Sequence, residues 1–576
     1  MRALIHKNSW KIKIGLSTIL MLFAFSSLKS SYDIEVRIVA DVNRDGKVQF
    51  GPDNQGKDKW TTERGAIFFN NNDSDQNTRT PDHADAVING KEDLKDLAIL
   101  KVKRIPELPD HTQVTVSVDE ASKGRVRLFV KAARNSYTPV DISKNGNIAQ
   151  ALLDKADLEL RIEANSYADG VWNGETQVVI TVKTPDEEIR SDSIKLKVAP
   201  FILLSNINKG KTLYVRKYPG KNDAFIQKLR QIVPQAGAEL HLVPAGEPYR
   251  EYHIWLQDTM EIGYSEKPGQ RMNVVLKANR NLSLDNFAKD KLLGPDFGWI
   301  QVGKFREKYG KGVRGNSWLD WYGNLEVTPP FPEYPFGRIY YGYNPDGPKE
   351  ASLNPEIVAM LEAQKIQAPA LRLDTGWLLI KHVDEMISFL PSGDPEHPYR
   401  ILVVDPGAMI ALLEKWMKNG NGDTRLLEVY SENTTVASLY KNENLIKHNK
   451  YLRTKRIEPN IDFLKRELGL REEDFIRVPA LFSKYGASIV PNMVNSAVLN
   501  GHILIAAPNG PVIDGKDQLE EEMRKLISGL PVEPHFMDDR QYHKWSGNVH
   551  CATNVRREGF KTPWWKKSPL NPYSPY

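Results

Sequence analysis

Four short segments of the chain carry the residue types that enzymes use for nucleophilic and acid–base chemistry. They read WLQDTME at residues 255–261, GNLE at 323–326, HVDE at 382–385 and HCATN at 550–554. The last segment contains Cys551, the only cysteine among 576 residues, which therefore cannot form an internal disulfide. A lone cysteine is often just a small buried hydrophobic residue, so its neighbours decide whether Cys551 is a nucleophile.

These residue types meet the requirements of a reaction at a guanidinium group. A guanidinium is planar, always charged and offers five N–H donors, so its site needs carboxylates, which Asp258 and Asp384 can supply. Resonance makes its central carbon a poor electrophile, and the thiolate of Cys551 is the best side-chain nucleophile for it. Ammonia release and water activation need a group that titrates near neutrality, for which His382 is the candidate. His382 and Asp384 follow a predicted strand at 377–380, so we expect both on one side of an extended segment.

Acidic loops in the N-terminal third predict a second kind of site. Asp41, Asn43 and Asp45 alternate with other residues before a glycine, a spacing that can place oxygen ligands around one calcium ion. A second acidic loop contains Asp73 and Asp75. The alternative is an ordinary solvated turn, because Asp, Asn and Gly also favour turns.

Hydrophobic patterning divides the chain into two folded regions. Residues 31–200 contain alternating runs rich in β-branched residues, as at 114–118, 126–130 and 177–182, which predict an antiparallel sandwich. Residues 201–576 alternate apolar strands with helical patterns, which predicts mixed α/β structure around the four segments. The strands are predicted at 201–204, 377–380, 401–404 and 502–506, and the helices at 224–232, 355–364, 462–468 and 517–527.

The first thirty residues predict export. Basic residues precede an apolar run at 14–25 and then small residues, the pattern of a secretory signal peptide, with an uncleaved anchor as the alternative. Residues 1–30 carry five of the 78 basic residues and none of the 73 acidic ones, so the remainder has no formal net charge. This balance argues against nucleic acid as a partner. We expect a secreted or periplasmic protein that meets a membrane only through its signal segment.

Together and in this order, the four segments closely resemble the catalytic domain of the peptidylarginine deiminases, calcium-dependent enzymes that convert arginine in proteins to citrulline. The resemblance extends to LGPDFG at 293–298, YPFGR at 334–338, KRELGL at 465–470 and VHCATNVRR at 549–557. The region with the Asp41 run and GAIFF at 65–69 is similar to the middle domain of this family. The resemblance implies a form that lacks the usual N-terminal cupredoxin-like domain.

The resemblance implies a multidomain fold. A signal peptide at 1–30 would precede an immunoglobulin-like, calcium-binding β-sandwich domain at 31–200 and a pentein catalytic domain at 201–576. The pentein is an α/β propeller of ββαβ modules with its active site at the centre. The implied reaction is hydrolysis of peptidyl-arginine to peptidyl-citrulline and ammonia through a covalent thiouronium intermediate on Cys551.

The resemblance also assigns a role to each candidate residue. Cys551 would be the nucleophile, His382 the acid and base, and Asp258 and Asp384 the carboxylates that clamp the guanidinium. Trp255 would form the wall for the arginine stem, and Arg280 would hold the peptide backbone of an arginine-containing protein or peptide. His550, beside the nucleophile, is expected to be a structural hydrogen-bonding residue.

One calcium site of the catalytic domain is implied to be present. Its ligands would be the side chains of Gln257, Glu261 and Glu326 and the backbone carbonyls of Tyr322 and Leu325. Calcium takes six to eight oxygen ligands, which this set begins to supply.

A neighbouring calcium site of the family is expected to be lost. It would need oxygen ligands where this chain has Thr259, Lys277 and Ala278, with only Asn281 retained. A lysine repels a cation and alanine offers no side-chain oxygen, so we expect one calcium ion in the catalytic domain and further ions in the first domain.

Three other functions would use some of the same residue types. A deiminase of free arginine or agmatine could use the same fold, although Arg280 and the preceding β domain argue against it. A non-catalytic calcium-binding adhesion protein would not need all the catalytic positions filled. A thiol protease fits poorly, because His382 lies far before Cys551 and the sequence around the cysteine matches neither papain-like nor caspase-like enzymes.

Overall fold

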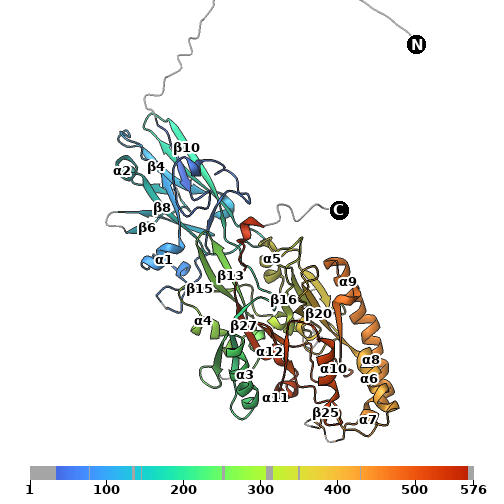
Figure 1. Cartoon of the computed structure of the whole chain (residues 1–576). Coiled ribbons are helices and arrows are strands. Elements are labelled where there is room, and N and C mark those ends of the chain that lie inside the picture. The colour runs from blue at the N-terminus through green and yellow to red at the C-terminus, as the bar shows by residue number, and fades with distance from the viewer. Residues whose placement is uncertain are drawn as a thin grey trace, which may run out of the picture.

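The computed structural model of the chain describes residues 34–567, apart from 77, 133–135, 145, 250–252, 307–315, 348–350, 429 and 432. The predicted signal peptide at residues 1–30 lies outside the described residues. A strand-rich N-terminal unit occupies one end of the molecule and a larger mixed unit the other (Figure 1). Within the described ranges, every helix is too short or too polar to cross a membrane.

The N-terminal unit consists of two five-stranded sheets that share one core. Buried side chains from both sheets, such as Leu160 and Ile180, belong to the same hydrophobic cluster. Strand β9 (Glu175–Lys183) alternates between buried and more exposed side chains, as expected when one face of a strand packs on a core. This alternation is the pattern that the sequence showed at 177–182.

Each sheet of this unit combines strands from distant parts of the sequence. One sheet runs β1 (Ile38–Ala40), β3 (Ala98–Val102), β8 (Leu158–Ala164), β5 (Val126–Lys131), β6 (Tyr137–Pro139). The other runs β2 (Ala66–Phe68), β10 (Ile189–Val198), β9, β4 (Gln113–Val118), β7 (Asn147–Ile148). Neighbouring strands are antiparallel except β2 and β10, and two short helices, α1 (Lys91–Asp96) and α2 (Gln150–Lys155), lie in the connections.

The C-terminal unit contains five three-stranded sheets with one common connectivity. In each sheet, the first strand runs antiparallel to the central strand, and a helical connection leads from the central strand to a third, parallel strand. Four sheets, written first, central, third, are β13 (Met260–Lys267), β14 (Gln270–Lys277), β15 (Phe297–Gln301); β16 (Leu325–Val327), β17 (Ile339–Tyr343), β18 (Leu371–Asp374); β19 (Ile387–Pro391), β20 (Tyr399–Asp405), β21 (Phe475–Pro479); and β22 (Ala497–Leu499), β23 (His502–Ala506), β26 (Glu533–Met537).

The fifth sheet joins the two ends of this unit. Its central and third strands, β11 (Gly210–Lys217) and β12 (Glu239–Pro244), come first in the unit, while its first strand, β27 (Thr553–Arg557), comes last. Val215 of β11 pairs with Thr553 of β27, directly after the segment with Cys551. Figure 1 shows the red elements α12 and β27 among the green elements of the early part of the unit. Closure therefore fixes Cys551 against residues more than three hundred positions earlier.

Helices cover the sheets of the second unit. The connections contain α3 (Asp223–Gln235), α4 (Phe287–Lys291), α5 (Pro355–Ala363), the group α6 (Pro406–Lys418), α7 (Val436–Tyr440), α8 (Glu443–Leu452), α9 (Glu458–Leu468), and then α10 (Gln518–Leu526). The central strand β20 is buried along almost its whole length, which explains the continuous apolar run at 401–404. All four helices predicted in this unit are present with shifted ends.

The two units meet through specific polar contacts. Lys267 Nζ donates to the backbone oxygen of Asp96 at 3.0 Å, and the Asp296 amide donates to Asp73 Oδ2 at 2.9 Å. Gln364 Nε2 donates to the Ala168 oxygen at 2.8 Å. The boundary expected at residue 200 falls in the connection between β10 and β11.

The strand predicted at 201–204 is wrong. This segment forms only an isolated bridge at Ile202, although all four of its residues are buried. Its amides bond to side chains instead of a ladder: Phe201 donates to Gln364 and Leu203 to Gln367. The apolar run reflects burial between the units, which a sequence pattern does not distinguish from a buried strand.

Candidate active site

The structure brings the four predicted catalytic residues into one buried site. Cys551 Sγ lies 3.4 Å from Asp384 Oδ2, and His382 Nδ1 lies 3.5 Å from Asp258 Oδ1. Gly323 lies among them, since a Cβ there would be 2.5 Å from His382 Nδ1 and 3.1 Å from an oxygen of each aspartate. All four side chains belong to residues at most 6% exposed.

The fivefold repeat of the second unit explains why these residues meet. A short segment precedes the first strand of each sheet, and each segment contributes one residue to the site. They are Asp258 in the 3-10 helix η5 (Gln257–Thr259) before β13, Gly323 in η8 (Tyr322–Asn324) before β16, Asp384 in η9 (Val383–Glu385) before β19, Asn495 before β22, and Cys551 in α12 (Val549–Ala552) before β27.

The extended segment predicted around His382 is wrong. Residues 377–380 form a turn, and the strand of this region, β18, ends earlier. The run is apolar because the turn is packed into the protein, with the Trp377 ring 4.9 Å from that of Phe482. His382 is the N-terminal cap of η9, so a tight turn, rather than strand alternation, places it beside Asp384.

Cys551 is held by Asn495. Asn495 Nδ2 donates to Cys551 Sγ at 3.2 Å, and its Oδ1 accepts from the Cys551 amide at 3.2 Å. Burial, followed by the charges of Asp384, Asp258 and Glu385, raises the pKa of the Cys551 thiol well above its usual value. Without a bound cation, Cys551 is therefore a thiol that faces an acidic pocket.

The ring of His382 presents one free nitrogen to the site. Its Nε2 lies 2.8 Å from the backbone oxygen of Trp318, which can only accept, so Nε2 carries the hydrogen. Nδ1 then faces Asp258 and has no hydrogen-bond partner within the described part of the chain. The Trp321 ring packs edge-on against the imidazole at 6.2 Å and fixes its orientation.

The two aspartates leave the site short of hydrogen-bond donors. Asp258 Oδ1 accepts a 3.3 Å bond from the Gly323 amide, and burial raises the pKa of Asp258 although His382 and Arg280 oppose this rise. Asp384 Oδ1 has no hydrogen-bond partner among the described residues. A cation with several N–H donors is the type of ligand that would satisfy these acceptors.

His550 connects this cluster to the predicted calcium site. Its Nδ1 lies 2.9 Å from Asp384 Oδ2, and its Nε2 lies 3.5 Å from Glu326 Oε1. Burial alone would lower the pKa of His550, but the charges of Glu326 and Asp384 raise it overall. His550 thus bridges two carboxylates, in line with a structural hydrogen-bonding role.

Trp255 lies at the edge of the site. Its ring is half-buried and packs 5.8 Å from that of Tyr542. A Cβ at Gly547 would lie 2.5 Å from the indole, so the absence of a side chain there makes room for the ring. The exposed part of the indole leaves a surface for an apolar stem.

Arg280 does not reach the site as expected. Its side chain is 0% exposed and forms an ion pair with Asp285, while Nη2 donates to Thr259 Oγ1 at 2.8 Å. The guanidinium also stacks over Trp321 at 5.5 Å. The expected contact with a substrate backbone would require Arg280 to leave these partners, because all its polar surface faces the protein interior.

The predicted calcium ligands of the second unit surround a small cavity of about 20 Å³. Gln257 Nε2 donates to Glu261 Oε2 at 2.9 Å and lies 3.3 Å from the Tyr322 oxygen, while Leu325 is the first residue of the strand that carries Glu326. The cavity has room for about one water-sized particle.

The charges in this cavity fit a cation. Burial and the mutual repulsion of Glu261 and Glu326 raise the pKa of Glu261 well above its usual value. Burial raises the pKa of Glu326 to about 7, and its Oε1 has no hydrogen-bond partner among the described residues. Arg557 also lines the cavity and supplies one positive charge, but it donates to the Val498 oxygen rather than to either glutamate.

In the first unit, Asp73 and Asp75 lie beside Asp96. Their ligand oxygens are all within 4.8 Å of one another. Burial, then the neighbouring acids, raises the pKa of Asp73 to about 9, and burial raises that of Asp96 to about 8 although Lys267 opposes it. Three buried carboxylates this close need a cation or protons, and this cluster lies at the contact with the second unit.

The Asp41 loop has the geometry of a hydrogen-bonded turn. The Asp45 amide donates to Asp41 Oδ1 at 3.0 Å and to Asn43 Oδ1 at 3.1 Å, and the Gly46 amide donates to Asp41 Oδ2 at 3.0 Å. These oxygens are therefore already used within the loop, as the turn alternative expects.

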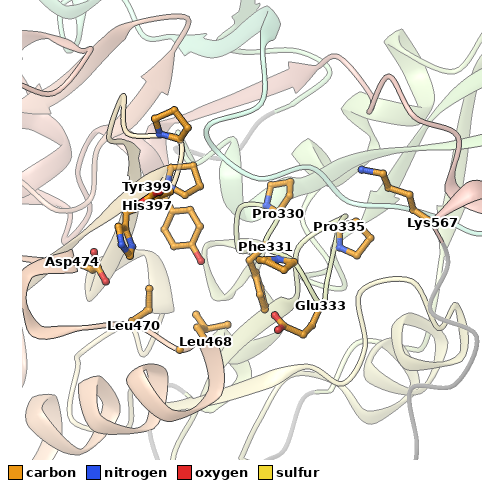
Figure 2. Close-up of a pocket in the computed structure, with 15 residues that line it drawn as sticks. Pro330, Phe331, Glu333, Pro335, His397, Tyr399, Leu468, Leu470, Asp474 and Lys567 are labelled. Atoms are coloured by element: carbon orange, nitrogen blue, oxygen red, sulfur yellow. The ribbon is translucent and has the colours of Figure 1, made fainter.

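A larger cavity of about 470 Å³ lies elsewhere in the second unit. Phe331 and Pro335 on one side face His397 and Tyr399 on the other (Figure 2). None of the four catalytic candidates lines it. The active site is therefore identified by its chemistry and not by cavity size.

Three residues of these sites were missed from the sequence. Asn495 holds the cysteine, Trp318 orients His382 through a backbone oxygen, and Asp96 completes the acidic cluster. A backbone contact leaves no signal in residue type, and Asp96 lies in a helix of mixed charge. The position of Asn495 two residues before a first strand is a signal, but only once the repeat is known.

Comparisons with known proteins agree with these observations. Residues 188–566 match the family model described as protein-arginine deiminase (PAD), and residues 34–183 match that of the protein-arginine deiminase middle domain. Protein-arginine deiminase type-4 of Mus musculus is 32% identical over 569 residues, and that of Homo sapiens is 31% identical over 568 residues. Each alignment covers 93% of this chain and 83% of the relative.

Among solved structures, a C. jejuni agmatine deiminase matches 63% of this chain and 97% of its own, at 12% identity and a TM-score of 0.38, too low to carry an argument. The matches to the family models and to the relatives do not depend on it. The chain belongs to the protein-arginine deiminase family.

Proposed function

We propose that this protein hydrolyses the guanidinium group of arginine residues in peptides and proteins, which gives citrulline and ammonia, in a reaction that depends on calcium. The observation that carries the proposal is a buried thiol that meets two carboxylates and the free nitrogen of a histidine around Gly323. Membership of the family supports the same reaction.

Substrate binding would use the acceptors that lack partners. A guanidinium beside Gly323 would donate to Asp258 and Asp384, including Asp384 Oδ1, and Trp255 would cover the aliphatic stem. The bound cation would also oppose the charges that raise the pKa of Cys551, so binding would favour the thiolate at the moment it is needed.

In the first half of the proposed reaction, the Cys551 thiol gives its proton to a base, for which we propose His382 Nδ1. The sulfur forms a bond to the central carbon, and the π electrons of one C–N bond move to its nitrogen. His382 protonates a terminal nitrogen, the C–N bond breaks and ammonia leaves. A thiouronium remains on Cys551.

In the second half, His382 takes a proton from water, and the water oxygen bonds to the same carbon. The carbon–sulfur bond then breaks, the thiolate leaves and regains a proton, and the oxygen loses its remaining proton to give the urea group of citrulline. The two halves need one group that both accepts and donates a proton. The free Nδ1 of His382 is placed for this.

Calcium would be held by Gln257, Glu261 and Glu326, with the carbonyls of Tyr322 and Leu325. The unpaired Glu326 Oε1 and the raised pKa values of both glutamates support this assignment. When bound, the ion would neutralise these charges and leave His550 to orient Asp384. A second calcium site is proposed at Asp73, Asp75 and Asp96. The Asp41, Asn43 and Asp45 loop is a weaker candidate, because its oxygens already accept bonds from the loop.

The architecture supports the fold that the resemblance implies. Two packed five-stranded sheets are compatible with an immunoglobulin-like domain at 31–200. Five sheets of one connectivity, closed by β27, are compatible with a pentein propeller at 201–576. We also propose export of the protein, on the basis of the basic and apolar pattern of residues 1–30.

Hydrolysis of free arginine is the second candidate. The buried state of Arg280 removes one of the two arguments against it, whereas the additional β domain remains. A calcium titration of citrulline release from a peptide with blocked ends, with free arginine in parallel, separates the two. We expect the peptide to react faster and only with calcium; faster turnover of free arginine would favour the second candidate.

The variant Cys551→Ala separates both reactions from a non-catalytic role. It should lose all citrulline formation and keep calcium binding, which calorimetry measures. Unchanged turnover in this variant would falsify the nucleophile assignment, and an inactive wild-type protein that binds calcium would favour an adhesion role.

A further inference from the structure

A second group of metal-ligating side chains lies outside the sites described above. His502 is the first residue of β23, and Glu533 and His535 lie on the neighbouring parallel strand β26. Glu533 pairs with His502, and His535 follows two residues later, so the three side chains point to one face of the sheet.

The facing atoms of these residues surround a single point. His502 Nδ1 lies 2.9 Å from His535 Nε2, and Glu533 Oε2 lies 3.5 Å from His502 Nδ1. The other oxygen, Glu533 Oε1, lies 3.9 Å from His535 Nε2. Ligand atoms about 2.0–2.1 Å from a tetrahedral zinc ion are about 3.3 Å apart, so these three separations bracket the value that such an ion requires.

We propose that His502, Glu533 and His535 form a binding site for a divalent transition-metal ion of the zinc class. Two imidazole nitrogens and a carboxylate are the donor set that zinc accepts, whereas calcium takes oxygen ligands. The imidazoles are mostly buried and Glu533 is 67% exposed, so a fourth position faces solvent. Burial and the charge of His502 lower the pKa of His535, which keeps its ring in the neutral form that binds metals.

The position of the site gives it a consequence for the fold. Farther along the same face, Leu504 and Met537 pack in one core with Val549 and Ala552 of α12. A metal ion would join β23 to β26 at the open end of this face. The sheet that supports the helix with Cys551 would then resist unfolding more strongly.

The test is a calorimetric titration of the full chain with zinc chloride, in saturating calcium to fill the oxygen sites. The background variant Cys551→Ser removes the thiol, which would otherwise compete for zinc. We expect one zinc ion to bind, and His502→Ala and His535→Ala each to weaken this binding by at least about tenfold. His241→Ala, which removes an exposed histidine from β12, is the matched control and should bind zinc as the background does.

Glu533→Gln protects the test against a folding defect, because this side chain is largely exposed. It should fold normally and bind zinc about tenfold more weakly. Thermal unfolding provides a second measurement: zinc should raise the melting temperature of the background and of His241→Ala, but not that of His535→Ala. Absence of zinc binding, or equal affinity in the histidine variants and the background, would overturn the proposal.

Discussion

At the scale of residues, the site combines a nucleophile with an environment that suppresses its reactive form. Asp384 lies 3.4 Å from Cys551 Sγ, and Asp258 and Glu385 add negative charge. A thiolate there is unfavourable until a cation enters. The same carboxylates that would select a guanidinium therefore also restrict the thiolate to the complex with substrate, which protects an otherwise free cysteine from other reactions.

Gly323 is the residue whose substitution tests this geometry most directly. In Gly323→Ala, the new methyl group would lie 2.5 Å from His382 Nδ1 and 3.1 Å from an oxygen of Asp258 and of Asp384, in the space proposed for the substrate. We expect kcat/KM for an arginine peptide to fall by about a hundredfold or more, because misplacement of reacting groups by about 1 Å has such effects.

Gly170→Ala is the matched control for this substitution. Its methyl group would make an ordinary contact at 3.5 Å with Ala359, far from the site in the chain, and activity should stay at the wild-type value. Steady-state citrulline release measures both variants. Normal activity in Gly323→Ala would show that substrate does not occupy this space.

At the scale of elements, the repeated sheet is the device that builds both sites. Residues two positions before a first strand include Asp258, Gly323, Asn495 and Cys551, all of which lie at the catalytic cluster. The second residue of a first strand is Glu261 in β13 and Glu326 in β16, which share the proposed calcium cavity. Neighbouring sheets thus place equivalent positions next to one another, with different residues at each.

The calcium cavity yields a prediction at this scale. Glu326→Gln removes one of two buried negative charges and keeps a similar shape, so it should weaken calcium binding. We expect the calcium concentration for half-maximal citrulline release to rise by at least about tenfold. The measurement is the calcium dependence of the rate, with calorimetry as an independent reading of affinity.

Glu333→Gln is the control for the loss of charge. Glu333 lies seven residues later on an exposed loop outside the calcium cavity. Its variant should have the calcium dependence of the wild type. The assignment of the cavity fails if Glu326→Gln also retains that dependence.

At the scale of the whole molecule, the acidic cluster of Asp73, Asp75 and Asp96 joins the two units. Asp73 accepts a hydrogen bond from the Asp296 amide, and the backbone oxygen of Asp96 accepts one from Lys267. A cation bound there would therefore stabilise the contact between the units as well as the loop itself. Calcium could act on the orientation of the first unit without direct contact with the active site.

This arrangement predicts a dependence of stability on pH. The folded-state pKa values of Asp73 and Asp96, about 9 and about 8, lie above the unfolded value of about 3.9. Without calcium, the free energy of unfolding should thus be highest below about pH 4 for these groups, and their contribution should be lost as the pH rises towards about 9. Urea unfolding between pH 5 and pH 9, with a chelator or with calcium, measures the effect.

The variant Asp73→Asn isolates this contribution, because the amide can still accept the bond from Asp296. In chelator, it should be more stable than the wild type at about pH 8, with a difference that narrows towards about pH 5. Calcium should stabilise the wild type more than the variant. Parallel pH curves for the two proteins in chelator would contradict the raised pKa of Asp73.

The sequence by itself determined the chemistry and the broad organisation. Residue types at 258, 382, 384 and 551 predicted a thiol, a histidine and two carboxylates around a cation, and local periodicity predicted the sandwich strands and the helices α3, α5, α9 and α10. These features are local or depend only on the kind of residue, so they can be read without knowledge of the fold.

Only the tertiary structure decided which segments meet. It showed that Asn495 holds Cys551, that Asp96 joins Asp73 and Asp75, and that Arg280 is buried against Asp285. It also showed that residues 377–380 form a buried turn, which their apolar character could not distinguish from a strand. Such contacts join positions far apart in the chain and depend on how five sheets close into one unit, and periodicity within a short window contains no information about that closure.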